Sequence, residues 1–230
     1  MNHLVFVTGS DTGVGKTVLT AALTRWLRGR GADAVGLKPL CSGGREDARE
    51  LHSASGGALA LAEVNPWHFR AALAPALAAR REGQRVKLAE VVARVRVVAG
   101  RFEVTVVEGA GGLLSPLVED GDNLDFLAAL RPTAVIAVVP NRLGAVNQAR
   151  LVLRALPAAQ RRRAVVVLVD QLGAGVAGRT NADLLAEFTP GVRVIRMPWL
   201  TEGARLSRRA ASALDELAES LGVRPVSRPA

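Results

Sequence analysis

A glycine-rich segment near the start of the chain has the composition of a phosphate-binding loop. It reads Thr8-Gly9-Ser10-Asp11-Thr12-Gly13-Val14-Gly15-Lys16-Thr17 and lies between an apolar run and a stretch of helical periodicity. Backbone N–H groups of such a loop, together with the following helix N-terminus, surround phosphate oxygens. Lys16 is expected to reach the outer phosphates, and the Thr17 hydroxyl to bind Mg²⁺. The segment predicts a nucleotide site made by Asp11, Thr12, Gly13, Val14, Gly15, Lys16, Thr17 and Val18.

The spacing of this loop departs from the commonest pattern. Gly9 and Gly15 enclose five residues, and Ser10 stands where the more usual spacing has glycine. The position between strand and helix, and the Gly-Val-Gly-Lys-Thr core, still favour nucleotide binding over an incidental glycine-rich turn.

Lysine is rare in this chain, and two lysines fall where phosphate is expected. Of 30 basic residues only Lys16, Lys38 and Lys87 are lysines. Lys38 follows a short apolar run and precedes Pro39-Leu40-Cys41-Ser42-Gly43. An ammonium is a compact point charge, whereas a guanidinium is a planar fork, so a phosphoryl-transfer site can require the former. We interpret Lys16 and Lys38 as catalytic.

A carboxylate ends a second apolar run. Glu108 follows Val104-Thr105-Val106-Val107 and precedes Gly109-Ala110-Gly111-Gly112. A carboxylate just past a buried strand, beside a phosphate loop, is expected to contact Mg²⁺. The glycines allow a substrate to approach the backbone closely. Asp47 could supply another carboxylate, although an Asp in a charged loop is on sequence alone usually solvated.

Other polar residues carry weaker signals. Cys41 has no nearby His–Asp pattern, and the three histidines lack metal-ligand spacing. The acidic residues of 119–125 are interpreted as a solvent-facing loop.

The elements that must position these residues alternate along the chain. Short β-branched apolar runs occupy 3–8, 34–37, 104–107, 134–139, 164–169 and 192–197, and amphipathic stretches include 16–28, 88–98, 145–156 and 181–188. This alternation predicts an α/β fold with a mainly parallel sheet and helices on both faces. Ligands of such sheets bind at the carboxyl ends of the strands.

Composition favours one soluble, cytoplasmic domain over 1–230, with 225–230 frayed. No repeat or linker divides the chain, and one cysteine excludes internal disulfides. No apolar stretch approaches the length of a membrane span, and no targeting segment precedes the first strand.

The net charge of +9 would alone suggest a nucleic-acid partner. The 27 arginines (30 − 3) are scattered, however, and the run 161–163 is interpreted as a solvated loop. Aromatic residues make up only 3% of the chain, which removes a stacking platform. We expect no nucleic-acid partner.

Taken together, the motifs resemble the dethiobiotin synthetase family in order and spacing. They are the loop 9–17, Lys38-Pro39 with Ser42-Gly43, Val64-Asn65-Pro66, Val107-Glu108-Gly109-Ala110-Gly111-Gly112, Leu143-Gly144 with Asn147, and Pro198-Trp199-Leu200. The match runs from the first strand to about residue 203, and Glu-Gly-Ala-Gly-Gly and Asn-Pro are not generic P-loop features.

The resemblance implies a doubly wound P-loop fold and a homodimeric, ATP- and Mg²⁺-dependent cyclo-ligase of biotin biosynthesis. One vicinal amine of 7,8-diaminopelargonic acid takes up CO₂ as a carbamate, whose oxygen attacks the γ-phosphate. The second amine then closes the ring on the mixed anhydride and expels phosphate, so that the products are dethiobiotin, ADP and phosphate. Catalysis is then mainly positioning and charge neutralisation.

The resemblance also implies roles for individual residues. Substrate and phosphate contacts fall on Thr12, Lys16, Lys38, Ser42 and Gly111, and Mg²⁺ contacts on Thr17, Asp47 and Glu108. The segment that receives the substrate's carboxylate tail from the other subunit falls on Leu143, Gly144, Ala145 and Asn147. Part of the base pocket falls on Pro198, Trp199 and Leu200.

One position departs from the family. After the strand 164–169 the family typically has an Asn that reads adenine, and this chain has Asp170. A carboxylate can only accept hydrogen bonds, so GTP or CTP becomes possible, with ATP still expected. The alternatives are that Asp170 points to solvent or that the Gln171 amide makes the contact.

A partitioning or septum-positioning ATPase is the main rival. Its loop carries a signature lysine five residues before the invariant one, where this chain has Asp11. A GTPase would need Asn-Lys-x-Asp, which Asn141-Arg142 does not begin, and a dinucleotide fold would need glycine at Val18.

Overall fold

The computed structural model describes residues 2–171, 173, 175–200 and 206–223. The tail 225–230, expected to be frayed, lies outside the described residues.

The centre of the molecule is a six-stranded sheet in the order β10-β9-β8-β1-β5-β2. All five pairings between its strands are parallel. Its strands are β1 (His3–Gly9), β2 (Ala34–Leu37), β5 (Val104–Glu108), β8 (Ala134–Asn141), β9 (Ala164–Asp170) and β10 (Arg193–Met197). This arrangement confirms the predicted doubly wound parallel sheet. Inner strands such as β8 and β9 are the buried apolar runs expected when both faces are covered, whereas the edge strand β10 carries exposed Arg193 and Arg196.

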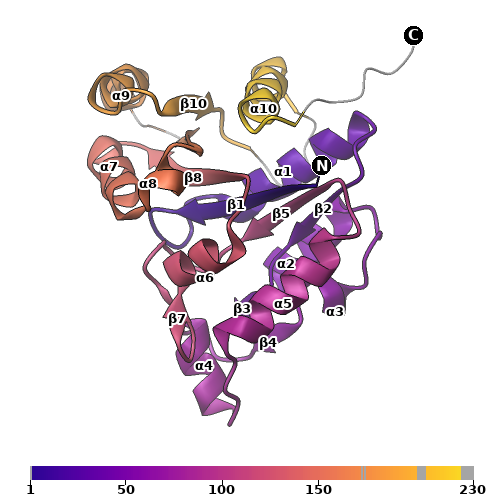
Figure 1. The fold of residues 1–230 in the computed structure, drawn as a ribbon. Coiled ribbons are helices and arrows are strands. Elements are labelled where there is room, and N and C mark those ends of the chain that lie inside the picture. Colours follow the sequence, from indigo (N-terminus) through magenta and orange to yellow (C-terminus); the bar gives the residue numbers. More distant parts are fainter. Residues whose placement is uncertain (1, 172, 174, 201–205, 224–230) are drawn as a thin grey trace.

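Helices cover both faces of this sheet (Figure 1). Alternate residues of a strand point to opposite faces, and accordingly Phe6 packs in one apolar cluster while Val5 and Val7 pack in another. The second cluster contains leucines of α1 (Lys16–Gly29) and α10 (Arg208–Ser220). The first cluster contains residues of α2 (Glu46–Ala54), α3 (Leu61–Val64), α4 (Pro75–Arg81), α5 (Leu88–Ala99), α6 (Asn123–Leu130), α7 (Ala145–Ala155) and α9 (Gly175–Phe188).

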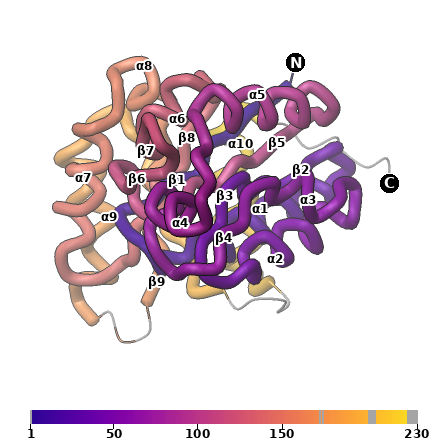
Figure 2. The backbone as a smooth tube through the Cα atoms, turned by 90° about the horizontal axis from the view of Figure 1, so that it is seen from below, coloured from indigo at the N-terminus to yellow at the C-terminus, as the bar shows by residue number. Residues whose placement is uncertain are grey.

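Two small sheets stand apart from the central one. Strand β3 (Leu40–Ser42) pairs in parallel with β4 (Trp67–Phe69), and β6 (Pro116–Val118) pairs antiparallel with β7 (Gly121–Asp122). Seen from below, they gather with α4 in the middle of the molecule (Figure 2). Short helix α8 (Ala158–Arg161) precedes β9. The sequence did not predict these elements, because segments of two to four residues give no periodicity.

Two interpretations need correction. Helix α9 begins at Gly175 and not near residue 181. The acidic residues of 119–125 are not merely solvent-facing: the Asp122 carboxylate accepts a hydrogen bond from the Asp125 N–H and caps α6, and Asp125 returns the contact. Paired polar groups of this kind satisfy N–H groups that a helix start leaves free.

Within the described ranges, no helix has both the length and the apolar character needed to cross a membrane.

Candidate active site

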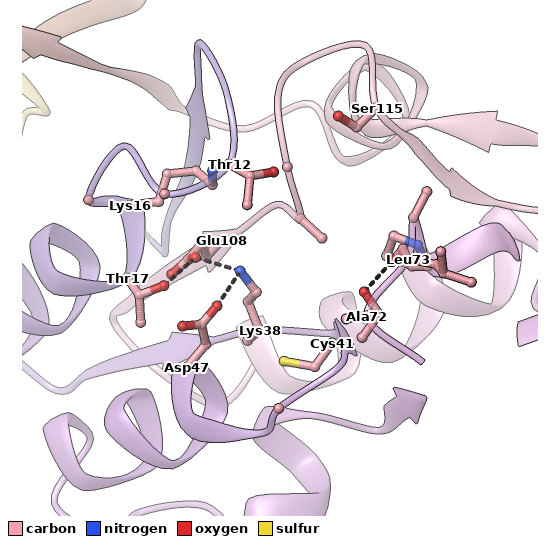
Figure 3. Close-up of a pocket in the computed structure, with 18 of the residues that line it drawn as sticks. Thr12, Lys16, Thr17, Lys38, Cys41, Asp47, Ala72, Leu73, Glu108 and Ser115 are labelled. Carbon is pink, nitrogen blue, oxygen red and sulfur yellow. Dashed lines mark hydrogen bonds and ion pairs between the residues drawn. The ribbon is translucent and has the colours of Figure 1, made fainter. Parts of the chain in front are cut away.

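A cavity of about 780 Å³ opens at the carboxyl ends of β1, β2 and β5 (Figure 3). Most of the predicted site residues line it: Thr12, Gly13, Gly15, Lys16, Thr17, Val18, Lys38, Ser42, Asp47, Glu108, Gly111 and Trp199. Parallel strands end together at one edge of a sheet, which is why residues so far apart in sequence converge here.

The phosphate loop wraps around the Lys16 side chain. Gly13 and Gly15 have φ of 71° and 93°, a left-handed conformation that only glycine adopts without strain. The Lys16 ammonium is almost fully buried and donates to the Asp11 carbonyl oxygen at 2.7 Å. No side chain caps α1 and no acidic residue lies in its first turn. The helix start therefore offers free N–H groups to an anion.

Lys38 lies at the centre of a buried charge cluster. Its ammonium donates to Glu108 Oε1 at 2.6 Å and lies 3.2 Å from Asp47 Oδ2. Glu108 Oε1 also accepts a hydrogen bond from the Thr17 hydroxyl at 2.8 Å. Figure 3 shows all four side chains pointing toward one another. The lysine and the three residues expected at Mg²⁺ thus share one corner of the cavity.

The two lysines experience opposite electrostatics. Burial lowers the pKa of Lys16 to about 8, and the nearby Lys38 charge acts in the same direction. Burial alone would also lower the pKa of Lys38, but the Glu108 and Asp47 carboxylates outweigh it and raise that pKa. Lys38 is therefore a permanent cation, whereas Lys16 gains or loses a proton at mildly alkaline pH.

The oxygen atoms in this corner suit a hard cation. Glu108 Oε2 is buried and makes no hydrogen bond within the described part of the chain. No three His, Cys, Asp or Glu side chains of the described residues converge as a metal site. Two carboxylates and a hydroxyl, completed by phosphate oxygens and water, are the ligands that Mg²⁺ commonly takes.

Two buried asparagines position the loops of the site. Asn65 donates from Nδ2 to the carbonyl oxygens of Lys38 at 2.8 Å and Trp67 at 3.0 Å. Asn123 donates to the carbonyl oxygens of Ala110 and Gly112, and its Oδ1 accepts from the Ala110 N–H. Asn65 was noted only as part of the Asn-Pro motif, and Asn123 carried no sequence signal.

Part of the cavity wall was not foreseen. It comprises Cys41, Gly44, Ala72, Leu73, Ala74, Pro75, Ala110, Ser115 and Pro116. The Ser42 hydroxyl donates to the Leu73 carbonyl oxygen, which joins this wall to β3. Burial raises the pKa of the Cys41 thiol to about 12, so this cysteine stays protonated, in agreement with its interpretation as an inert small residue.

Other predicted site residues lie outside the cavity. They are Asp11, Val14, Asp170, Pro198, Leu200, Leu143, Gly144, Ala145 and Asn147. Asp11 still contributes its carbonyl oxygen to Lys16, and Val14 is buried beneath the loop. Gly144 is the N-cap of α7, and Leu143 beside it is 83% exposed. The cross-subunit role of this segment stays a prediction.

Asp170 lies in a polar network at the ends of three strands. Its Oδ1 accepts from Asn141 Nδ2 at 2.7 Å and from Arg196 Nε at 2.8 Å. The Gln171 amide donates back to the Val169 and Asp170 carbonyl oxygens. Whether Asp170 reads a base stays a prediction.

Comparison with known proteins identifies the family. A model described as an AAA domain matches residues 3–205. The ATP-dependent dethiobiotin synthetase BioD of Anaeromyxobacter dehalogenans (strain 2CP-C) is 42% identical over 218 residues, covering 91% of this chain and 96% of that protein. The BioD protein of Xanthomonas oryzae pv. oryzae (strain PXO99A) is 42% identical over 161 residues, 66% of this chain and 71% of its own length.

Solved structures share the fold at low identity. The hydrogenase maturation factor HypB of Archaeoglobus fulgidus gives a TM-score of 0.57 at 15% identity, covering 96% of this chain and 90% of that one. A ParA family ATPase of Chlorobium tepidum TLS gives 0.57 at 12% identity, covering 99% and 95%. Likeness at this level supports the P-loop α/β fold, while the sequence relatives carry the closer assignment. The chain belongs to the dethiobiotin synthetase family.

Proposed function

We propose that this protein acts as a single-domain, cytoplasmic cyclo-ligase that converts 7,8-diaminopelargonic acid, CO₂ and ATP into dethiobiotin, ADP and phosphate. The observation that carries the proposal is a pair of buried lysines, Lys16 at the end of the phosphate loop and Lys38 directly after β2. Two fixed ammonium groups can neutralise both a transferring phosphoryl group and a carbamate.

The chemistry begins with a carbamate. A substrate amine forms a C–N bond to CO₂ and loses a proton. The carbamate oxygen then forms a bond to the γ-phosphorus while the bond to the ADP oxygen breaks. The second amine attacks the carbonyl carbon, the C–O bond to the phosphoryl group breaks, and phosphate leaves as the amine loses its proton.

Residues of this chain have separate tasks in these steps. Lys16 binds phosphate oxygens beside the loop N–H groups, and Lys38, held by Glu108, faces the carbamate and the phosphoryl group. Thr12, Ser42 and Gly111 line the same cavity and position the diamine. A cavity of about 780 Å³ falls in the range that holds small-molecule ligands.

A magnesium ion belongs to the proposal. Thr17, Asp47 and Glu108 would hold it, and the unpartnered Glu108 Oε2 supports this fit. When bound, Mg²⁺ supplies charge neutralisation on the triphosphate. Trp199, which lines the cavity, with Pro198 and Leu200, contributes to the base pocket for ATP.

The partners are proposed to be small molecules and a second copy of this chain. Leu143, Gly144, Ala145 and Asn147 would receive the substrate's carboxylate tail across a two-fold axis. The exposed start of α7 supports this placement, because free N–H groups at a helix start attract a carboxylate.

The test is phosphate release from ATP with and without diaminopelargonate and bicarbonate. We expect release to require both and to match dethiobiotin formed, one for one. Equal release without the diamine would favour a regulatory ATPase and overturn the proposal. A Lys16→Ala variant serves as the inactive control.

A further inference from the structure

A second concave site, here named the arginine pocket, lies away from the phosphate loop. Its volume is about 550 Å³. Its lining combines four arginines with a mostly apolar wall: Arg150, Leu153, Arg154, Arg161, Arg162, Phe188, Thr189, Pro190, Gly191 and Val192. No role in the proposed reaction uses any of these residues.

The positive charge of this pocket is uncompensated. None of the ten lining residues is acidic. Within the described ranges, none of the four arginines forms an ion pair, whereas Arg25, Arg80 and Arg101 each pair with a glutamate. Arg154 and Arg161 lie in last helical turns, where the helix dipole favours a cation. The helix dipole accounts for single cations at helix ends, but it does not account for four arginines that line one concave pocket.

An aromatic ring gives the pocket a second kind of surface. The Phe188 side chain is half exposed, and the Arg150 guanidinium lies 5.3 Å from its ring centroid. This distance is within the range of a cation–π contact, which orients the guanidinium against the ring. Leu153, Pro190 and Val192 extend the apolar wall. The site therefore offers both positive charge and apolar contact.

The arginine pocket is separated from the active site by the length of the sheet. Arg161 and Arg162 precede β9, and Gly191 and Val192 precede β10, so the pocket lies at the amino ends of these strands. The catalytic cavity lies at the carboxyl ends. Strands of five to seven residues, at about 3.3 Å per residue, span roughly 20 Å. Helices α7, α8 and α9 lie together beside β8 and β10 (Figure 1).

We propose that the arginine pocket is a second binding site, for a small phosphorylated molecule with an apolar or planar body. Guanidinium forks match phosphate oxygens in pairs, and the Phe188 ring receives the body. The concave shape and apolar wall favour a small ligand over a nucleic acid, which would need an extended basic track.

The test is equilibrium binding of 1-naphthyl phosphate and of inorganic phosphate, without nucleotide and without turnover. It therefore does not depend on the proposed cyclo-ligase activity. The variant Arg154→Gln/Arg161→Gln removes two exposed charges from the pocket. Its matched control, Arg81→Gln/Arg94→Gln, removes two exposed charges from α4 and α5. A third variant, Phe188→Ala, removes only the ring.

We expect the pocket double variant to bind 1-naphthyl phosphate at least about tenfold more weakly, on the order of 1.4 kcal/mol, with the control within about twofold of wild type. Phe188→Ala should weaken 1-naphthyl phosphate and leave inorganic phosphate unchanged. Equal losses in both double variants would overturn the proposal. The proposal would also fail if Lys16→Ala alone abolished binding of 1-naphthyl phosphate, because the ligand would then bind at the phosphate loop. It would likewise fail if these arginines bound heparin while the protein did not bind 1-naphthyl phosphate.

Discussion

Lys38 Nζ lies 2.6 Å from Glu108 Oε1, and both side chains are almost fully buried. Buried charges are stable only when they are paired closely, so each fixes the other's position. Asp47, nearly half exposed, contributes a second carboxylate at 3.2 Å. The geometry therefore holds the Lys38 ammonium at one point in the cavity.

Lys16→Arg and Lys38→Arg should each lower turnover by at least about tenfold, or on the order of 1.4 kcal/mol of transition-state stabilisation. A planar guanidinium cannot occupy the same point as an ammonium. Steady-state kcat measures the effect, and Lys87→Arg, at an exposed lysine, is the control. Wild-type rates in both active-site variants would show that these two positions do not require an ammonium group.

Nucleotide binding should weaken above about pH 8. Because the pKa of Lys16 in the free protein is about 8, the side chain loses its charge as pH rises through that value. Bound phosphate favours the charged form of Lys16, so the side chain takes up a proton when the nucleotide binds. Each pH unit above about 8 should therefore lower the nucleotide affinity by up to about tenfold. Calorimetry in buffers of different ionisation enthalpy should detect proton uptake near pH 8.5. Lys16→Arg should abolish that uptake; persistent uptake would assign it to another group.

Asn65→Ala should destabilise the fold and slow turnover together. Its loss leaves the carbonyl oxygens of Lys38 and Trp67 without their hydrogen bonds in a buried region. Each unsatisfied group costs about 1–3 kcal/mol. Urea denaturation gives the free energy of unfolding, and Asn2→Ala, which removes a contact at an exposed asparagine, is the control. Equal stability in both variants would contradict the positioning role.

An inactive Lys16→Ala chain mixed with an inactive Asn147→Ala chain should recover activity. If the tail site comes from the other subunit, each mixed dimer contains one intact site, and random pairing gives about a quarter of wild-type activity. Subunit exchange is verified with differently tagged chains. Proven exchange without recovery would argue that both residues serve the same site within one chain.

Asp170→Asn should shift nucleotide preference toward ATP. Both described contacts of the Asp170 carboxylate reach Oδ1, so Oδ2 remains available to accept from a base amine. An amide can also donate to adenine, and such a contact is worth about 1–3 kcal/mol. The measurement is kcat/KM for ATP, GTP and CTP; Gln171→Ala, measured in parallel, tests the alternative that the Gln171 amide reads the base. Unchanged ratios would show that Asp170 only holds strand ends together.

The sequence predicted the central sheet well, because strands buried on both faces are continuous apolar runs. It missed the first two turns of α9, where Gly175, Gly178 and Thr180 are weak helix formers. Tertiary contact overrides that weakness, since the buried Gly178 carbonyl oxygen accepts from Asn141. The helix is therefore longer than its local composition indicates.

The charged residues at strand ends were also predictable, because parallel strands place their carboxyl ends together. Asp47 lies in the first turn of α2; its local sequence favours a solvated side chain over a metal ligand, and only the family resemblance raises it to a Mg²⁺ contact. Asn123 and the wall at Ala72 to Pro75 meet the site through contacts between distant segments. No local pattern encodes such contacts.

The central position of β1 has a consequence for the newly made chain. This strand pairs with β5 on one side and with β8 on the other. At about 5–20 residues per second, a ribosome makes these partners only about 5–25 s after β1. During that interval the apolar strand β1 has two unpaired edges, which is the condition under which strands from different chains associate. We expect newly synthesised chains to depend on chaperones most strongly before residue 141 has emerged.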